Sequence, residues 1–311
     1  MTVVEEGSFS KAANRLFISQ QALSEVISGI EHNYGLTLFN RTQPISLTFA
    51  GKHFAEMATR LLLEKKNMED ALSLISDDKK GSLSVGFPAE YASFILPLTL
   101  PKLKQKYPLV EFEWEYGNTH SLEYKLLRGE LDLIIGFNGF RSREIETIYS
   151  VHERTYIAVP GEIMRGLAGD RLEKQVEEFR NGVDVNYFGN GPYLMLLNNG
   201  NRCHFRRTVD RTLETSGIIP DVAYEGPGMV TLLNLAREGL GIAFVPEYLL
   251  AAYARDHDFQ ETYIFPLKNQ NSGRILKIAH CGEDVLSKYE VFFVETVEAA
   301  LQSLRGSDNT V

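Results

Sequence analysis

The sequence predicts a mixed fold, in which an all-α N-terminal part with a long linker helix precedes an α/β region of two subdomains. Helical signals dominate residues 8–75 and are interrupted only by a short polar hairpin. From Gly81 onward, strand patterns alternate with helix patterns, which is typical of a parallel sheet covered on both faces. The alternation restarts after about residue 152. Two α/β units joined by strand crossings therefore fit better than one large sheet.

Two short helices and a hairpin are expected at the start of the chain. Ser10 is expected to cap a helix over residues 11–16, and Ser19 to cap a second helix that ends at Gly35. One face of the second helix is apolar, formed by Leu23, Ile27 and Ile30. Residues 40–48 are polar and short-stranded, like a hairpin. Two helices, a tight turn and a wing give helix-turn-helix geometry.

A long helix is expected over residues 48–76. Apolar or small residues recur on it with heptad spacing, and one lysine, Lys65, interrupts them; the others are Phe54, Ala58, Leu61, Met68, Leu72 and Ile75. This pattern predicts a coiled-coil seam between two copies of the chain. The alternative is a helix packed on its own domain. The charged stretch at residues 77–81 resembles a linker.

The α/β region begins with a strand at residues 83–87 and a helix at 91–107, which Pro97 and Pro101 should start late or kink. Further strands are expected at 110–116, 131–135, 156–159, 193–197, 222–224, 242–245 and 276–279. Further helices are expected at 121–128, 172–179, 202–216, 229–237 and 285–304. Such βαβ succession predicts a doubly wound arrangement.

Composition excludes several classes of protein. The 311 residues are 44% apolar and 23% charged, which is ordinary for a globular chain. Residues 1–80 are nearly neutral and residues 81–311 hold almost all of the net charge of −9, so a coat of nucleic acid over the whole molecule is not expected. No apolar run is long enough to cross a membrane, and the first residues have neither the basic nor the apolar region of a signal peptide, so none is expected. Two cysteines suit a reducing cytoplasm.

Catalytic and metal-binding patterns are missing from the sequence. Seven histidines are scattered without HExxH or Cys/His spacing, so no metal site is expected. The sequence has neither GxSxG nor a nucleotide fingerprint, so no cofactor and no enzyme activity are predicted.

Polar residues at the start of the second helix are candidates for DNA contact. Glutamine can form paired hydrogen bonds to adenine in the major groove, and serine hydroxyls and helix N-terminal amides can bind phosphate. Basic residues beside the hairpin suit backbone phosphates. The expected DNA-binding residues are Ser10, Ser19, Gln20, Gln21, Ser24, Arg41 and Lys52.

A longer array of residues at fixed spacing carries a family resemblance. Between residues 7 and 51 it comprises Gly7-Ser8-Phe9-Ser10-Lys11-Ala12-Ala13, Leu16, Ile18-Ser19-Gln20-Gln21-Ala22-Leu23-Ser24, Ile27, Ile30-Glu31, Gly35, Leu38-Phe39, Arg41, Leu47-Thr48 and Ala50-Gly51. It resembles the winged helix-turn-helix of LysR-type transcriptional regulators. The resemblance continues at 81–86, 96–97, 107–108, 127–135 and 239–246. It implies a regulatory region like periplasmic binding proteins, with an inducer held between two subdomains.

The resemblance is incomplete at three places. The family has further residues before the equivalent of Met1, and here only Val3 and Val4 are left to cover the helix-turn-helix core, so the first helix is expected to be truncated. Either the start is assigned too late or the DNA-binding domain is weakened. Glu25 stands where a basic residue is frequent, and would repel phosphate or accept from cytosine. Gln21 replaces a frequent proline.

The resemblance and the pattern changes predict three segments. Residues 1–52 are expected to form the winged helix-turn-helix DNA-binding domain, residues 53–80 the linker and dimerisation helix, and residues 81–311 the effector-binding domain. Within the last, subdomain I is expected over about 81–152 and 266–311, and subdomain II over about 153–265.

An effector site is expected where strands end in the C-terminal region. In open α/β sheets, ligands bind outside the carboxyl ends of the strands, and helix N-termini there favour an anion or a polar acid. Thr119 is the preferred contact because a hydroxyl both donates and accepts, whereas Glu90 would disfavour an anion unless a cation neutralises it. The expected effector-binding residues are Ala89, Glu90, Tyr91, Asn118, Thr119, His120, Asn198, Asn199, Gly228 and Met229.

The sequence thus predicts a cytoplasmic DNA-binding transcriptional regulator controlled by a small-molecule effector. Its expected partners are double-stranded DNA carrying an inverted repeat, the effector, and further copies of itself in a homodimer or homotetramer, with no membrane. The alternative is a solute-binding protein of a transporter, which the C-terminal fold alone would permit. The array at residues 7–51 counts against it, as does the expectation that no signal peptide is present.

Overall fold

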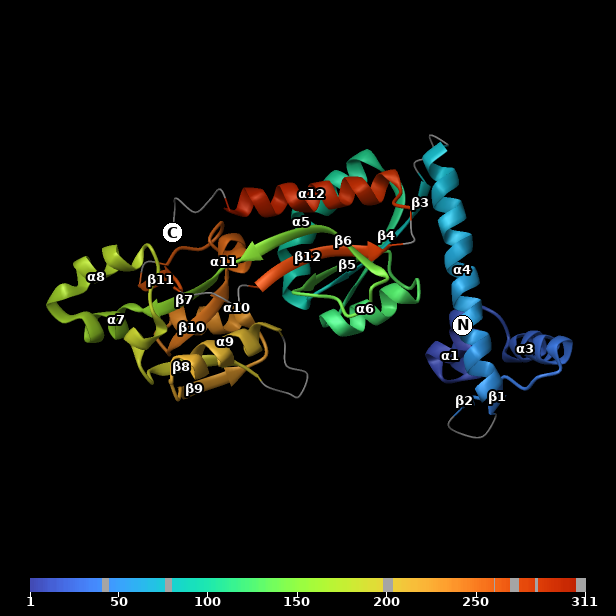
Figure 1. The fold of residues 1–311 in the computed structure, drawn as a ribbon, viewed down its shortest axis with the longest axis horizontal. Coiled ribbons are helices and arrows are strands. Elements are labelled where there is room, and N and C mark those ends of the chain that lie inside the picture. Colours follow the sequence, from blue (N-terminus) through green and yellow to red (C-terminus); the bar gives the residue numbers. More distant parts are fainter. Residues whose placement is uncertain are drawn as a thin grey trace. The chain divides into compact units, whose positions relative to one another are not determined.

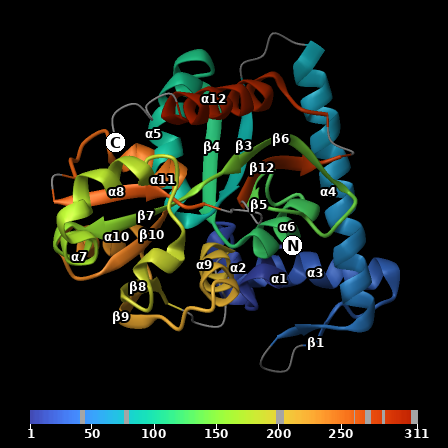
Figure 2. The same ribbon diagram turned by 60° about the vertical axis from the view of Figure 1, so that its left-hand side comes forward.

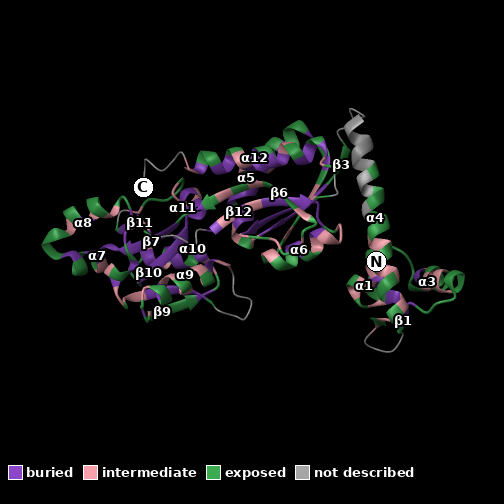
Figure 3. Ribbon diagram, viewed as in Figure 1, coloured by how far each residue is buried: buried purple, intermediate pink, exposed green. Residues whose placement is uncertain are grey.

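A computed structural model describes residues 1–40, 45–75, 80–197, 204–259, 261–268, 274–282 and 285–305. The chain packs as two units, Met1–Ile75 and Ser76–Val311 (Figure 1). Each unit has a buried apolar cluster of its own. Figure 3 shows the buried residues of the second unit concentrated along its strands.

The N-terminal unit consists of short helices, a two-stranded hairpin and a long helix. Its elements are α1 (Thr2–Glu6), α2 (Phe9–Arg15), α3 (Gln20–Tyr34), β1 (Phe39–Asn40), β2 (Ser46–Leu47) and α4 (Phe49–Ile75). Its core gathers Val3, Phe9, Ala12, Ala13, Leu23, Leu38 and Phe39. The predicted helix-turn-helix followed by a hairpin wing is confirmed.

The first helix of the helix-turn-helix begins earlier than the sequence suggested. Ser8, rather than the expected Ser10, is its N-cap, and the Lys11 backbone N–H donates to Ser8 Oγ at 3.4 Å. The earlier start places Phe9 on the helix and in the core, where its ring packs edge-on against Phe39. Burial of an aromatic ring therefore sets the helix start.

The second helix has the ends that the sequence predicts. The Ala22 N–H donates to Ser19 Oγ at 3.1 Å, so Ser19 caps α3. Gly35 ends the helix in the left-handed region, with φ of 63°.

Glu31 and Gly51 hold the hairpin against the helices. Near the end of α3, Glu31 Oε1 accepts from the backbone N–H groups of Leu38 and Phe39, at 2.7 and 3.3 Å. In the first turn of α4, Gly51 lies so close to Leu38 that a Cβ built there would stand 1.9 Å from the Leu38 carbonyl oxygen. Thr48 adds a hydrogen bond to this joint between the hairpin and α4, because its N–H donates to the Leu38 carbonyl oxygen at 2.9 Å.

Lobe I of the C-terminal unit is a five-stranded sheet in the order β4-β3-β5-β12-β6. Its elements are β3 (Lys80–Phe87), α5 (Ala89–Lys106), β4 (Leu109–Tyr116), α6 (Thr119–Leu127), β5 (Leu133–Phe137), β6 (Ile145–Glu153), β12 (Arg274–Cys281) and α12 (Lys288–Arg305). The strands β3, β4 and β5 run parallel, whereas β12 runs antiparallel to both neighbours. The helices α5 and α12 cover one face and α6 the other (Figure 1).

Lobe II is a second five-stranded sheet, in the order β11-β7-β10-β8-β9. Figure 2 labels four of its strands, β7, β10, β8 and β9. Its strands are β7 (Thr155–Pro160), β8 (Pro192–Leu196), β9 (Asp221–Gly226), β10 (Ile242–Pro246) and β11 (Thr262–Pro266). Its helices are α7 (Gly161–Ala168), α8 (Leu172–Phe179), α9 (His204–Thr215), α10 (Met229–Arg237) and α11 (Glu247–Tyr253), with 3-10 turns η1 (Gly169–Arg171) and η2 (Val185–Phe188).

The chain passes between the lobes twice. The strand β6 of lobe I ends at Glu153, and β7 of lobe II begins at Thr155. The chain returns after β11, which ends at Pro266, and re-enters lobe I with Arg274 at the start of β12. Lobe II is therefore inserted into lobe I, and the predicted pair of α/β units joined by strand crossings is confirmed.

Several elements were not expected from the sequence, namely β6, α7, α11 and β11. Polar residues alternate weakly along β6, an edge strand whose one neighbour among the described strands is β12. The final helix begins at Lys288 rather than at residue 285. A capping box explains the later start: the Ser287 N–H and hydroxyl donate to Glu290, whose own N–H donates to Ser287 Oγ.

The two prolines of α5 do not delay its start. The helix runs without a break from Ala89 to Lys106, with Pro97 and Pro101 inside it, so the expected late start is wrong. One face of the helix is buried in the core through Tyr91, Ile95 and Leu103. Burial of these large side chains outweighs the loss of two helical N–H donors.

The close approach at Gly51 predicts a large cost for an added methyl group. Gly51→Ala should lower the free energy of unfolding by about 1–3 kcal/mol, because the Leu38 backbone must shift. Gly29 in α3 is the matched control, since a Cβ there meets nothing within 4 Å. Gly29→Ala should raise stability by about 1 kcal/mol through helix propensity. Chemical denaturation of both variants measures the difference, and equal stabilities would contradict this account of the joint.

Candidate functional site

The start of α3 presents a polar surface. Ser19 and Gln20 are exposed, and Ser10 of α2 donates from its hydroxyl to Gln20 Oε1 at 2.6 Å. This bond engages the oxygen of the Gln20 amide, whose Nε2 group is a donor. Gln21 Nε2 donates to Glu25 Oε1 at 3.1 Å one turn later.

The other predicted DNA-binding residues are distributed around this surface. Ser24 is half-buried on α3, and Lys52 is exposed in the first turns of α4. Arg41 lies outside the described residues. The N-terminal unit therefore brings Ser10, Ser19, Gln20 and Gln21 to the start of one helix, and holds Lys52 at the base of the hairpin.

The long helix α4 carries exposed apolar side chains. Leu61 is 71% exposed, and Met57, Leu62 and Met68 are also exposed. Phe54 differs, because its ring packs edge-on against Tyr34 and belongs to the core of its own unit. Phe54 therefore fits the alternative of packing within the domain. The side chains of Leu72 and Ile75 lie outside the described part.

A cavity of about 890 Å³ opens in the C-terminal unit, with lining residues from both lobes. Four segments that follow strands line it: residues 88–91 after β3, 117–120 after β4, 138–139 after β5 and Pro227 and Met229 after β9. Its other lining residues are Tyr116, Glu123, Phe137, Arg141, Leu196, His204, Phe205, Arg207 and Arg274. The cavity thus lies at the carboxyl ends of parallel strands, as expected for open α/β sheets.

A buried ion pair supplies Arg274 to one wall of the cavity. Arg274 and Glu153 are 2% and 1% exposed, and Arg274 Nη1 lies 3.3 Å from Glu153 Oε2. The Tyr91 hydroxyl donates to Glu153 Oε1 at 2.5 Å. The guanidinium also lies over the Phe137 ring, 3.7 Å from its centroid. Burial raises the pKa of Glu153, and the Arg274 charge opposes that rise.

Arg274 keeps an unused donor in this wall. Its Nε is buried and makes no hydrogen bond within the part of the chain that the structure describes. A buried N–H without a partner costs free energy, so such a group is a candidate for ligand binding.

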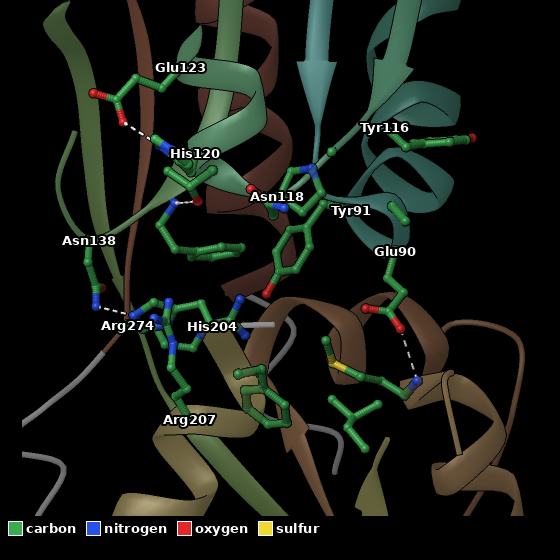
Figure 4. Close-up of a pocket in the computed structure, with 18 of the residues that line it drawn as sticks. Glu90, Tyr91, Tyr116, Asn118, His120, Glu123, Asn138, His204, Arg207 and Arg274 are labelled. Carbon is green, nitrogen blue, oxygen red and sulfur yellow. Dashed lines mark hydrogen bonds and ion pairs between the residues drawn. The ribbon is translucent and has the colours of Figure 1, made fainter. Parts of the chain in front are cut away.

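A second unused donor lies on His204, beside Arg274 in Figure 4. The side chain of Asn138 is oriented by β12, because the Ile275 N–H donates to Asn138 Oδ1 at 3.0 Å. Asn138 Nδ2 therefore points to His204 Nε2 and donates to it. Burial and the nearby arginines lower the pKa of His204 to about 4, so the ring is neutral at pH 7. The neutral ring then carries its proton on Nδ1, which is buried and makes no hydrogen bond within the described residues.

Glu90 occupies the start of α10 from across the cavity. Its Oε1 accepts from the Met229 N–H at 3.0 Å, so α5 of lobe I is joined to α10 of lobe II (Figure 4). Burial raises the pKa of Glu90, while the Met229 N–H and Arg274 lower it. The start of α10 and the Arg274 charge therefore both stabilise the Glu90 carboxylate.

The loop after β4 uses its polar side chains for the fold. Asn118 Oδ1 accepts from the Ser121 N–H at 2.9 Å and caps α6. Thr119 Oγ1 accepts from the Phe137 N–H at 3.2 Å, so a valine there would leave that amide without its partner. His120 is exposed, 4.0 Å from Glu123 Oε2.

The remaining predicted effector residues divide as follows. Ala89 and Tyr91 line the cavity, but the Tyr91 hydroxyl is engaged by Glu153. Gly228 caps α10 and does not line the cavity. Asn198 and Asn199 lie outside the described residues.

Arg274, His204 and Asn138 were not predicted from the sequence. Arg274 is the first residue of β12, an antiparallel strand. The expectation that ligands bind at the carboxyl ends of parallel strands therefore does not indicate it. His204 begins α9, next to residues outside the described part. Among described residues, no group of three or more metal-ligating side chains is placed to hold a metal ion, and no described helix is long and apolar enough to cross a membrane.

Both parts of the chain match known families. Residues 1–52 match the bacterial regulatory helix-turn-helix proteins of the lysR family, and residues 76–267 match the LysR substrate binding domain. A curated relative, the uncharacterized HTH-type transcriptional regulator YcgK of Bacillus subtilis, is 29% identical over 254 residues, which cover 78% of this chain and 76% of the relative.

Solved structures share the fold. Full-length OxyR from Pseudomonas aeruginosa superposes with a TM-score of 0.67 at 21% identity, covering 98% of this chain and 91% of OxyR. Full-length CbnR complexed with its target DNA gives a TM-score of 0.56 at 21% identity, covering 96% of each chain. With a winged helix-turn-helix, a two-lobed C-terminal unit and matches over most of its length, the chain belongs to the LysR family of bacterial helix-turn-helix transcriptional regulators.

Proposed function

We propose that this regulator responds to a small organic carboxylate held between Arg274 and His204. The observation that carries the proposal is a pair of buried N–H donors in one wall of the cavity, Arg274 Nε and His204 Nδ1, which have no hydrogen-bond partner among the residues that the structure describes. A carboxylate has two oxygens that accept from two donors at once, and a guanidinium favours it in charge and shape.

The surroundings of the two donors favour an anion with an apolar body. Phe137 and Phe205 flank the Arg274 guanidinium, and Leu196 and Met229 also line the cavity. Aromatic and aliphatic walls with a few convergent polar groups are typical of small-molecule sites. Glu153 offsets the Arg274 charge, which lets the cavity exist without a ligand.

Binding there would bias the two lobes toward one arrangement. Arg274 belongs to lobe I and His204 to lobe II, so a ligand that bridges them stabilises the arrangement in which both donors are within reach. The Glu90–Met229 bond already joins the lobes on another side of the cavity. We expect the effector to alter operator binding or activation by changing the arrangement of lobe I relative to lobe II.

Arg274→Lys tests the carboxylate site. Lysine keeps a positive charge opposite Glu153 but removes the Nε donor and the planar guanidinium, so the fold should survive. The probes are a panel of aliphatic and aromatic monocarboxylates, with their amides and inorganic phosphate as controls. We expect at least one carboxylate to raise the unfolding temperature of the wild-type chain, and Arg274→Lys to weaken its binding by about 2 kcal/mol.

The control variant is Arg165→Lys, at a surface arginine that pairs with Glu261 away from the cavity; its carboxylate binding should be unchanged. Equal binding of acids and amides, or full carboxylate binding by Arg274→Lys, would refute this site.

For DNA, we propose that Gln20 reads a base and that Lys52 contacts phosphate. The exposed start of α3 and the Ser10 hydrogen bond support the role of Gln20. Gln20→Ala should cost about 1–3 kcal/mol on the preferred sequence and relax preference at one base pair. Lys52→Ala should weaken all sequences alike and flatten the salt dependence. Equal losses on preferred and random DNA for Gln20→Ala, measured by fluorescence anisotropy, would argue against base reading.

We further propose that α4 joins two copies of the chain. Leu61 and Met68 are large, apolar and exposed at heptad spacing, which favours a partner helix. Leu61→Asp places a charge in that seam and should dissociate the dimer in sedimentation experiments. Glu64→Asp, at an exposed position on the same helix, is the control. The same oligomer in wild-type and Leu61→Asp proteins would exclude this seam.

Because the protein acts on DNA, we propose that it is cytoplasmic. Both parts of the chain have a role in a transcriptional regulator, so we propose no enzymatic activity. The solute-binding alternative is not favoured, because it leaves the N-terminal unit without a role. A second copy of α3 across a two-fold axis would read an inverted repeat.

A further inference from the structure

The turn between α2 and α3 contains a residue in a strained conformation. Phe17 has φ of 55°, in the left-handed region that bulky side chains rarely adopt. The only other non-glycine residue described with positive φ is Asn138, a residue type that tolerates it. Phe17 is also 97% exposed, so its ring contacts almost nothing within the chain.

Backbone hydrogen bonds explain the conformation but not the side chain. The Phe17 N–H donates to the Asn14 carbonyl at 3.2 Å, and the Ile18 N–H donates to the Ala13 carbonyl at 3.1 Å. These two bonds form a Schellman motif at the end of α2, where glycine is the favoured residue. Phenylalanine here carries the backbone strain and exposes an apolar ring, and the fold gains nothing from either.

The exposed ring belongs to a larger apolar tip. Leu16 and Ile18, on either side of Phe17, are 43% and 42% exposed. Three consecutive large apolar residues on a surface are unfavourable unless they meet a partner. We define Leu16, Phe17 and Ile18 as the apolar tip.

The position of the apolar tip identifies the partner. Ile18 immediately precedes Ser19, the N-cap of α3, and Gln20 begins the helix. In a helix-turn-helix, the N-terminal residues of the second helix meet base edges in the major groove. The apolar tip therefore adjoins the start of α3, the surface that we propose to meet DNA.

We propose that Phe17 is a further DNA-contacting residue, whose ring packs against the methyl group of a thymine at the edge of the operator half-site. The thymine methyl is the apolar group of the major groove, and phenylalanine is suited to contact it. The contact deepens the proposed reading of DNA by α3 and rests on it. It adds preference for one thymine without adding a phosphate contact.

The test uses the full-length chain and a duplex that the wild-type chain selects from a random-sequence library. Phe17→Asn keeps a residue that tolerates positive φ and removes the ring. We expect about tenfold weaker binding of the selected duplex, with the same salt dependence as wild type. The unfolding temperature should stay the same or rise, because the strain is relieved. A purely structural residue would lower both affinity and stability.

Replacing each thymine of the duplex by uracil, one at a time, removes only the methyl group. The wild-type chain should lose affinity at one position where Phe17→Asn loses none. Leu36→Asn is the matched control, because Leu36 is exposed on the same unit but follows the far end of α3; its affinity should match wild type.

Unchanged affinity in Phe17→Asn would overturn the proposal, and lower promoter activity in that case would assign the ring to a protein partner. Affinity lost together with stability would also overturn it, since Phe17 would then serve folding. A uracil scan in which no position separates wild type from Phe17→Asn would exclude the thymine contact. If the wild-type chain selects no duplex, the DNA-reading function itself fails, which is a different result from any of these.

Discussion

The buried pair of Glu153 and Arg274 is the constraint on which the C-terminal unit depends. The two residues face each other in the register of β6 and β12, at the points where the chain leaves lobe I and returns to it. Neither charge could be buried alone, because an unpaired ion in this interior would cost several kcal/mol. Tyr91 adds a hydrogen bond to Glu153 from α5. One ion pair thereby ties the strand crossings to the core and turns an arginine toward the cavity.

A small number of residues also positions the elements of the N-terminal unit. Glu31 lies on α3, yet its carboxylate fixes the hairpin through two backbone N–H groups. Gly51 lets α4 begin against the same residue, Leu38. The recognition helix, the wing and the long helix are therefore positioned by contacts that converge on one short segment. The surface that we propose to contact DNA can keep its shape in this way although its own side chains are exposed.

The N-terminal elements and the two-lobed architecture could be predicted because local signals specify them. Ser19 and Gly35 mark helix ends through their own backbone chemistry, and β5 is apolar because both faces of its sheet are covered. The cavity was only partly predictable. Strand ends indicated Glu90 and Thr119, but not that their side chains are used by Met229 and Phe137.

The donors of the cavity were missed for a physical reason. Arg274 and His204 are 70 residues apart in sequence and meet only because β12 pairs with β5 and β6 after the second crossing. Nothing local distinguishes Arg274 from an ordinary surface arginine at a strand start. The orientation of His204 depends on Asn138, whose side chain is in turn fixed by the backbone of β12. Long-range register of this kind leaves no periodic pattern in the sequence.

The most direct test of this account is a crystal structure of the full-length protein with a carboxylate that raises its unfolding temperature. We expect carboxylate oxygens within hydrogen-bond distance of Arg274 Nε and His204 Nδ1, with Glu153 still paired to the guanidinium. A carboxylate bound elsewhere, with both donors untouched, would contradict it.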